Sequence, residues 1–212
     1  VVFSGGVGGS GVAGVEGMDG FLRATNADAG RITSVAQTRP GGMLVGLAQV
    51  APVAGPAWGR VMALPSIGQR LAALHDDTTR AELIEEGRRK GTWYDPAFIH
   101  PLGTGELPVY DTTAAGSLAD LAAARGVHPV EVVVDQLLET DGRALFNVWF
   151  FNRDGESLGE YLQLENVCPG LGDAGAHAGQ ICDADAPTHY LAYWGHERRK
   201  VGLEEAVHDL TA

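Results

Sequence analysis

The sequence predicts an α/β protein, in which parallel strands alternate with crossover helices. From Ser117 onward, helical and apolar segments follow one another in the order helix, strand, helix, strand, helix. Residues 144–151 form a nearly continuous apolar run, as expected of a strand that is buried on both faces. The 30 glycines are roughly twice the average usage and indicate many tight loops. Such alternation favours a parallel sheet with its connecting helices outside.

The first half of the chain mixes strands, helices and loops. Residues 1–4 and 32–38 have the apolar and β-branched content of strands. Between them we expect a glycine-rich loop at residues 5–14 and a weak helix at residues 15–26. Residues 43–50 form an apolar run of undetermined type, and residues 52–58 are expected to be a loop. Two helices are expected at residues 66–75 and 78–90, followed by a long irregular segment at residues 93–111. Long irregular segments in compact domains are usually functional.

The second half carries clearer start and stop signals. Ser117 with Asp120 resembles a helix N-cap, and Gly126 ends that helix. Pro129 suits the first turn of the next helix. After the strand at 144–151, we expect a short helix at residues 157–163 and a strand at residues 166–172. Two further helices are expected at residues 187–199 and 203–210.

Composition restricts the class of function. The chain has 212 residues and a formal net charge of −12, which argues against nucleic-acid or anionic-membrane partners. The two cysteines, Cys168 and Cys182, give no disulfide framework and are expected to be reduced. No run is long and apolar enough to span a bilayer, and no signal peptide opens the chain. We therefore expect a cytoplasmic protein.

Asp173 is the strongest candidate for a catalytic residue. The strand at residues 166–172 leads directly into it, and the glycines at 172 and 175 allow backbone or substrate to approach closely. A carboxylate at the carboxyl end of a buried strand commonly serves as a metal ligand or general base. The alternative is that Asp173 caps the next helix. His177 follows four positions later and stands out among the histidines because of this neighbour.

The glycines Gly6, Gly8 and Gly11 supply a second candidate. They fit the pattern G-x-G-x-x-G directly after a strand, which in a dinucleotide fold brings a pyrophosphate to a helix N-terminus. The expected acidic residue at the end of the next strand is missing, although Arg39 there could serve a 2′-phosphate and so favour NADP. Val12 stands where a P-loop requires lysine, which excludes that motif.

Arg39 is also a candidate for substrate binding. An arginine at the carboxyl end of a strand can clamp a substrate carboxylate in a bidentate manner. The alternative is a salt bridge on the protein surface.

Several blocks of the sequence resemble the N-acyl-D-amino-acid deacylase (D-aminoacylase-like) branch of the amidohydrolase superfamily. The main block is LGDAGAHAGQICDA at residues 171–184, with Pro-Thr at 187–188 and Tyr-Trp at 193–194. Residues 38–47 and 139–145 resemble segments near later strands of that family. The resemblance implies a partial TIM (β/α)₈ barrel, roughly strands five to eight with outer helices.

The resemblance also implies a chemistry. The family hydrolyses C–N amide bonds with one or two divalent metals, usually Zn²⁺, whose bound hydroxide attacks the carbonyl. Asp173 matches the aspartate that follows the eighth strand, and would be a metal ligand and the general acid/base. His177 would face the substrate, an N-acylated D-amino acid or related amide.

The chain departs from the family in several ways. It lacks the H-x-H of the first strand, and no histidine lies near Gly5 or Gln37, where the fifth and sixth strands would end. We therefore expect residues 1–212 to be the C-terminal half of the barrel, without the N-terminal half and the small β domain. We expect little activity from this half alone, and we expect its open edges to favour oligomers or aggregation. The alternatives are an NADP-binding oxidoreductase and a non-catalytic, degenerate half-barrel.

Overall fold

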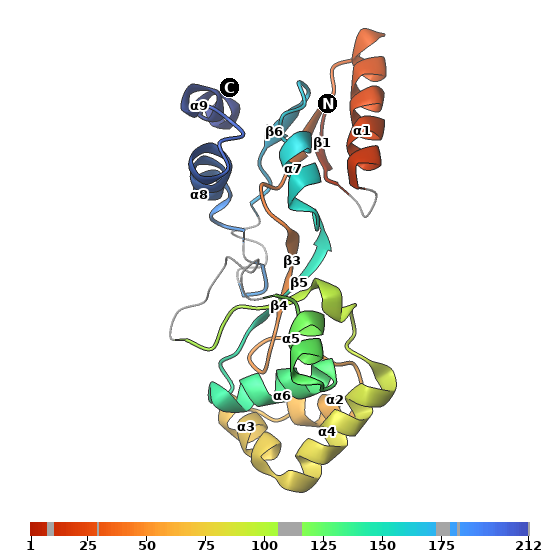
Figure 1. Cartoon of the computed structure of the whole chain (residues 1–212), viewed down its shortest axis with the longest axis vertical. Helices are drawn as coiled ribbons and strands as arrows, with labels where there is room; N and C mark the ends of the chain where they lie inside the picture. The colour runs from red at the N-terminus through yellow and green to blue at the C-terminus, as the bar shows by residue number, and fades with distance from the viewer. Residues whose placement is uncertain (8–10, 29, 106–115, 173–178, 182, 212) are drawn as a thin grey trace. The chain divides into compact units, whose positions relative to one another are not determined.

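The protein is a mixed α/β structure that divides into two compact units along the chain. The computed structural model describes residues 1–7, 11–28, 30–105, 116–172, 179–181 and 183–211. Unit 1 comprises residues 1–42 and 149–212, and unit 2 comprises residues 43–148 (Figure 1). None of the described helices has the length and apolar content needed to cross a bilayer.

Unit 1 is built on a parallel sheet of three strands in the order β1-β2-β6. Its strands are β1 (Val2–Gly5), β2 (Thr33–Ala36) and β6 (Val167–Pro169). In register, Val35 faces Ser4 on one side and Cys168 on the other. Helix α1 (Gly11–Ala27) connects β1 to β2, so these three elements form a βαβ unit. This confirms the predicted parallel arrangement for these strands.

The remaining helices of unit 1 cover this sheet. They are α7 (Gly155–Tyr161), α8 (Ala186–His189), the π-helical η2 (Tyr190–Glu197) and α9 (Leu203–Thr211). Helix α1 packs against α7, and α9 packs against β6 and η2. Leu22, Tyr161, Tyr190 and Trp194 are among the fully or almost fully buried side chains of the shared core.

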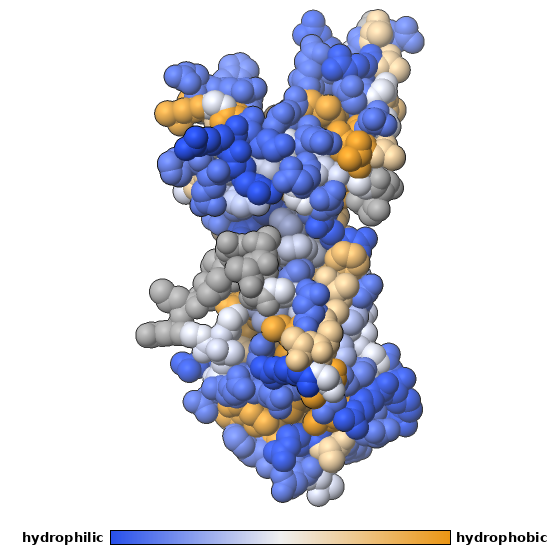
Figure 2. All heavy atoms as spheres, in the orientation of Figure 1, coloured by the Kyte–Doolittle hydropathy of each residue, from blue (hydrophilic) through white to orange (hydrophobic). Residues whose placement is uncertain are grey.

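Helix α9 also has an apolar outer face. Leu203 is 68% exposed and Val207 is 48% exposed, and hydrophobic side chains are visible at the position of α9 in Figure 2.

Unit 2 is mainly helical. Its helices are α2 (Pro56–Met62), α3 (Ile67–His75), α4 (Asp77–Lys90), the short η1 (Pro96–Phe98), α5 (Leu118–Arg125) and α6 (Pro129–Glu139). The predicted N-caps are present: Ser117 and Asp120 form a reciprocal capping box at α5, and Pro129 opens α6. The structure adds a cap that was not predicted, since His128 accepts the Val130 N–H through Nδ1.

The second sheet has the strand order β3-β5-β4. Its strands are β3 (Gly41–Val45), β4 (Ile99–Pro101) and β5 (Phe146–Phe151). Strand β5 pairs antiparallel with β4, so its predicted place in the parallel sheet is wrong. The reason lies in β4: three residues ending in a proline gave no strand signal, yet they supply the partner of β5.

The strand order also differs from a run of neighbouring barrel strands. In a barrel segment β5 would lie between β2 and β6, whereas here β2 pairs directly with β6. A partial barrel is not evident in the part of the chain that the structure describes, and the half-barrel stays a prediction. Residues 52–58, expected to be a loop, contain the start of α2 at Pro56.

Candidate functional site

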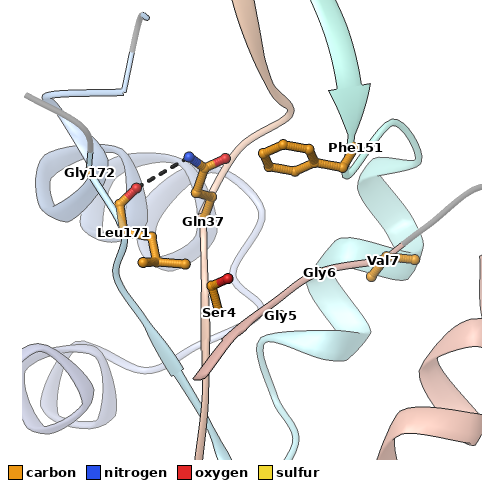
Figure 3. Close-up of a pocket in the computed structure, with 8 residues that line it drawn as sticks. All are labelled: Ser4, Gly5, Gly6, Val7, Gln37, Phe151, Leu171 and Gly172. Atoms are coloured by element: carbon orange, nitrogen blue, oxygen red, sulfur yellow. Dashed lines mark hydrogen bonds between the residues drawn. The ribbon is translucent and has the colours of Figure 1, made fainter. Parts of the chain in front are cut away.

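A pocket of about 500 Å³ opens in unit 1 where the parallel strands end (Figure 3). The residues that line it come from the carboxyl end of β1, the residue after β2, the end of β5 and the segment after β6: Ser4, Gly5, Gly6, Val7, Gln37, Phe151, Leu171 and Gly172. In α/β sheets this edge is the usual place for a ligand, because loops there can vary without disturbing the strands.

Asn152 fixes the backbone beside the pocket. It is fully buried and lies in the left-handed region with φ 56°, which asparagine tolerates better than most residues. Its Oδ1 accepts the Val7 N–H at 2.8 Å, and its Nδ2 donates to the Gln37 carbonyl at 3.4 Å. A Cβ at Gly6 would lie 2.8 Å from this Oδ1. Asn152 therefore ties the ends of β1 and β2 together, and Gly6 is required by this close packing.

Gln37 carries the main polar side chain of the pocket. Its Nε2 donates to Asp183 Oδ2 at 2.7 Å and to the Leu171 carbonyl at 3.2 Å, and Figure 3 shows the second of these bonds. Asp183 is 3% exposed, so this buried carboxylate fixes the amide group in place. Gln37 Oε1 is buried and accepts no hydrogen bond from the described residues.

Two further features lie at the pocket lining, one packed against Gly5 and one at the rim. Beneath Gly5, the buried hydroxyls of Ser34 and Tyr161 hydrogen-bond at 2.7 Å. Burial raises the pKa of Tyr161, and the Ser34 hydrogen bond opposes that rise only partly, so the phenol stays neutral. At the rim, Leu171 has φ 63° and is 41% exposed. A leucine in this conformation is strained, and such residues are concentrated at functional sites.

Arg39 does not line the pocket. Its side chain is almost buried and its Nη1 donates to Asp185 Oδ1 at 2.6 Å. The alternative to substrate binding, a salt bridge, is therefore present, but the arginine is buried and only the aspartate is half exposed. In this structure the guanidinium is paired with the Asp185 carboxylate. Substrate binding by Arg39 stays a prediction.

His189 lies beside this ion pair. Burial, and then the charge of Arg39, lower the pKa of His189 to about 4, while Asp185 and a hydrogen bond to the Thr38 backbone oppose the shift. The imidazole is therefore neutral near pH 7. It stacks on Tyr193 with ring centroids 5.0 Å apart, and the neighbouring Trp194 donates from Nε1 to the Thr38 carbonyl at 2.6 Å.

The other predicted site residues lie partly outside the described residues. Asp173, His177 and Gly8 fall in segments that the structure does not describe, so their predicted roles stay predictions. Among the described residues, no group of three or more histidine, cysteine, aspartate or glutamate side chains is placed to hold a metal ion. Cys168 is a free thiol, as expected, and burial raises its pKa.

Gln37, Asn152 and Asp183 were not predicted as site residues. Gln37 is 146 residues from Asp183, and Val7 is 145 residues from Asn152, so no local pattern could join them. The one available signal was Asn152 itself: an asparagine directly after an apolar strand, followed two residues later by Asp154 and a glycine, is typical of a left-handed turn.

Unit 2 contains another pocket, of about 430 Å³. It is lined by the aromatic pair Trp93 and Tyr94 together with Gly91, Thr92, Asp95, Pro96, His128 and Pro129. Two of its polar side chains serve helix ends: Asp95 accepts the Ala97 N–H at 3.0 Å, and His128 caps α6. The pocket of unit 1 is therefore the better candidate site.

Comparison with known proteins gives no relative. No family model matches the chain, and neither the curated proteins nor the solved structures contain a match.

Proposed function

We propose that unit 1 forms part of the active site of a hydrolase that cleaves C–N amide bonds in N-acylated amino acids, with N-acyl-D-amino acids as the preferred class. One observation carries the proposal. The pocket lies where β1, β2 and β6 end, and Leu171 and Gly172, which line it, lead directly into Asp173. The motif around Asp173 and the position of the pocket thus point to the same edge of the sheet. The partial barrel that the resemblance implies would also require β5 to lie between β2 and β6, which pair directly here.

The described residues would bind and orient the substrate. Leu171 and Phe151 give the pocket apolar walls that suit an acyl chain. Ser4 and Gln37 offer a hydroxyl and an amide to the polar part of the ligand. An apolar cavity with a few fixed polar groups is the usual form of a small-molecule site.

The described residues do not fit the metal that the resemblance implies. Zinc in a hydrolase usually has three protein ligands from histidine, cysteine or carboxylate side chains. The pocket lining supplies a serine and a glutamine instead. A divalent metal here would need Asp173 together with ligands beyond the described residues. The role proposed for Asp173 itself is to take a proton from the attacking water and deliver it to the leaving amine.

Zinc titration of the 212-residue chain by calorimetry tests this proposal. Because the described residues supply no set of three ligands, we expect weak zinc binding, and we expect Asp173→Asn to weaken it at least about tenfold further, since the amide is a poorer ligand than the carboxylate. The control is Asp28→Asn at an exposed position, which should leave zinc affinity unchanged. Absence of zinc binding, or equal binding by Asp173→Asn, contradicts the metal-hydrolase proposal and favours a non-catalytic domain.

A turnover assay tests whether this chain by itself contains a complete active site. The chain by itself should release little amine from N-acetyl-D-amino acids in the presence of zinc. Normal metal-dependent turnover would show that the site is complete within these 212 residues.

The NADP-binding alternative has one observation in its favour. Strand β1, helix α1 and strand β2 form a parallel βαβ unit with Gly6 after the strand and Gly11 at the start of the helix. Two contacts weigh against it: the Val7 N–H already donates to Asn152, and Arg39 is paired with Asp185. NADPH fluorescence titration distinguishes the NADP-binding alternative from the hydrolase. We expect no binding, and micromolar binding that Arg39→Met abolishes would establish the alternative.

A further inference from the structure

The side-chain amide of Gln37 is held in one orientation. Its Nε2 donates to two acceptors, Asp183 Oδ2 and the Leu171 carbonyl. Reversing the amide would place its oxygen against both of these acceptors, which is unfavourable. The position of Oε1 is therefore determined by the network around it.

Gln37 Oε1 is left as an unused acceptor. It is buried, and none of the described residues donates a hydrogen bond to it. It turns toward the Phe151 ring in the pocket (Figure 3). Both lie against Gly41, where an added Cβ would be 2.1 Å from Oε1 and 2.2 Å from Phe151 Cε2. Buried acceptors are nearly always paired in proteins, so this one calls for an explanation.

Phe151 gives a ligand access to this oxygen. It is the last residue of β5 and is 42% exposed, so its ring can change rotamer without disturbing the core. The inference requires the Phe151 ring to turn away from Oε1, because this oxygen is buried in the structure. A ligand that meets it gains most if it brings an N–H group, because a donor satisfies the oxygen whereas another acceptor opposes it.

We propose that Gln37 is a specificity residue, whose Oε1 accepts a hydrogen bond from the amide N–H of the ligand and so selects amides over esters. The inference rests on the proposed function, because it concerns ligands of the same pocket. It adds a reason why that pocket would prefer an N-acylated amino acid to an O-acylated hydroxy acid of the same shape.

Two ligands that differ in one group test this inference. N-acetyl-D-leucine and the O-acetyl ester of the matching D-2-hydroxy acid are titrated into the isotope-labelled chain and followed by NMR. We expect the amide to bind about tenfold more tightly than the ester, the effect of one net hydrogen bond. Gln37→Met, which removes the acceptor while keeping the length of the side chain, should reduce this ratio to within about twofold. Gln163→Met, at an exposed position whose Nε2 donates to Lys200 O, is the matched control and should keep the full ratio.

The outcomes separate this inference from the proposed function. If amide and ester bind the unsubstituted chain equally, or if Gln37→Met keeps the preference, the role of Gln37 is wrong while the pocket still binds acylated acids. If neither ligand binds, the proposed function fails and the role of Gln37 fails with it. If Gln37→Met does not fold, the ratio of amide to ester affinity in the unsubstituted chain still tests the role of Gln37.

Discussion

The two units use buried polar side chains in different ways. In unit 2, Glu86 is 3% exposed and accepts the N–H groups of Ala57 and Trp58 at 2.9 and 3.1 Å, at the start of α2. In unit 1, Gln37 keeps a buried acceptor without a partner among the described residues, and Asn152 and Leu171 adopt left-handed conformations beside the same pocket. Unit 2 uses Glu86 to complete a helix end, and its own unpaired buried acceptor among the described residues, Gln136 Oε1, lines neither pocket. Unit 1 leaves unsatisfied and strained groups around a cavity, which is typical of a binding site.

The largest effect is expected from removing the Glu86 carboxylate. Glu86→Leu would leave the buried Ala57 and Trp58 N–H groups without an acceptor, and should lower the free energy of unfolding of unit 2 by about 3 kcal/mol. Urea denaturation followed by circular dichroism measures this, and Glu85→Leu at an exposed neighbouring position is the control. If Glu86→Leu lowers the free energy of unfolding no more than Glu85→Leu does, Glu86 does not stabilise the start of α2, and the contrast between the two units is wrong.

A smaller loss is expected at Asn152. Asn152→Ala removes the hydrogen bonds to Val7 and Gln37 and places alanine in the left-handed region, so unit 1 should lose about 2 kcal/mol. Asn152→Asp keeps the acceptor for Val7 and should lose less. Hydrogen exchange of the Val7 amide reports the local effect: it should accelerate in Asn152→Ala. Unchanged exchange would show that Asn152 does not hold the end of β1.

The smallest effect concerns pH. The pKa of His189 is lowered to about 4 in the folded protein, against an ordinary value near 6.5. Between these values the unfolded chain binds a proton that the folded chain does not. The contribution of His189 is therefore fully present above pH 6.5 and is lost as the pH falls toward 4. The loss should be on the order of 1 kcal/mol, since the ring is partly solvated.

Denaturation curves at a series of pH values, compared between the unsubstituted chain and His189→Gln, measure this contribution. The difference between the two should shrink as the pH falls from 6.5 to 4. A difference that stays constant over that range would show that His189 titrates normally, and that the region around Arg39 is more open than the structure indicates.

Local signals in the sequence predicted much of the fold. The capping pattern of Ser117 and Asp120 and the proline at 129 placed α5 and α6 correctly, because each signal depends on residues within one turn. Helix α2 was missed because the residue that completes its first turn, Glu86, lies 29 positions from Ala57. Strand β4 was missed because it is short and contains a proline.

The candidate site was harder to predict for the same reason. The strand ends at Gly5 and Gln37 could be located from apolar and β-branched runs. The contacts that organise them, Gln37 with Asp183 and Val7 with Asn152, join residues far apart in the chain. Arg39 was correctly given a salt bridge as one of two interpretations, but neither its burial nor its partner Asp185 could be inferred from spacing.

The most direct test of the account is to map where an N-acylated amino acid binds. N-acetyl-D-leucine is added to the isotope-labelled chain, and the amide chemical shifts are followed by NMR. The account predicts that the largest shifts occur at Gly5, Gly6, Gln37 and Leu171 in unit 1, while Trp93 and Tyr94 in the pocket of unit 2 stay unchanged. Largest shifts at Trp93 and Tyr94, or no shifts at all, would contradict it.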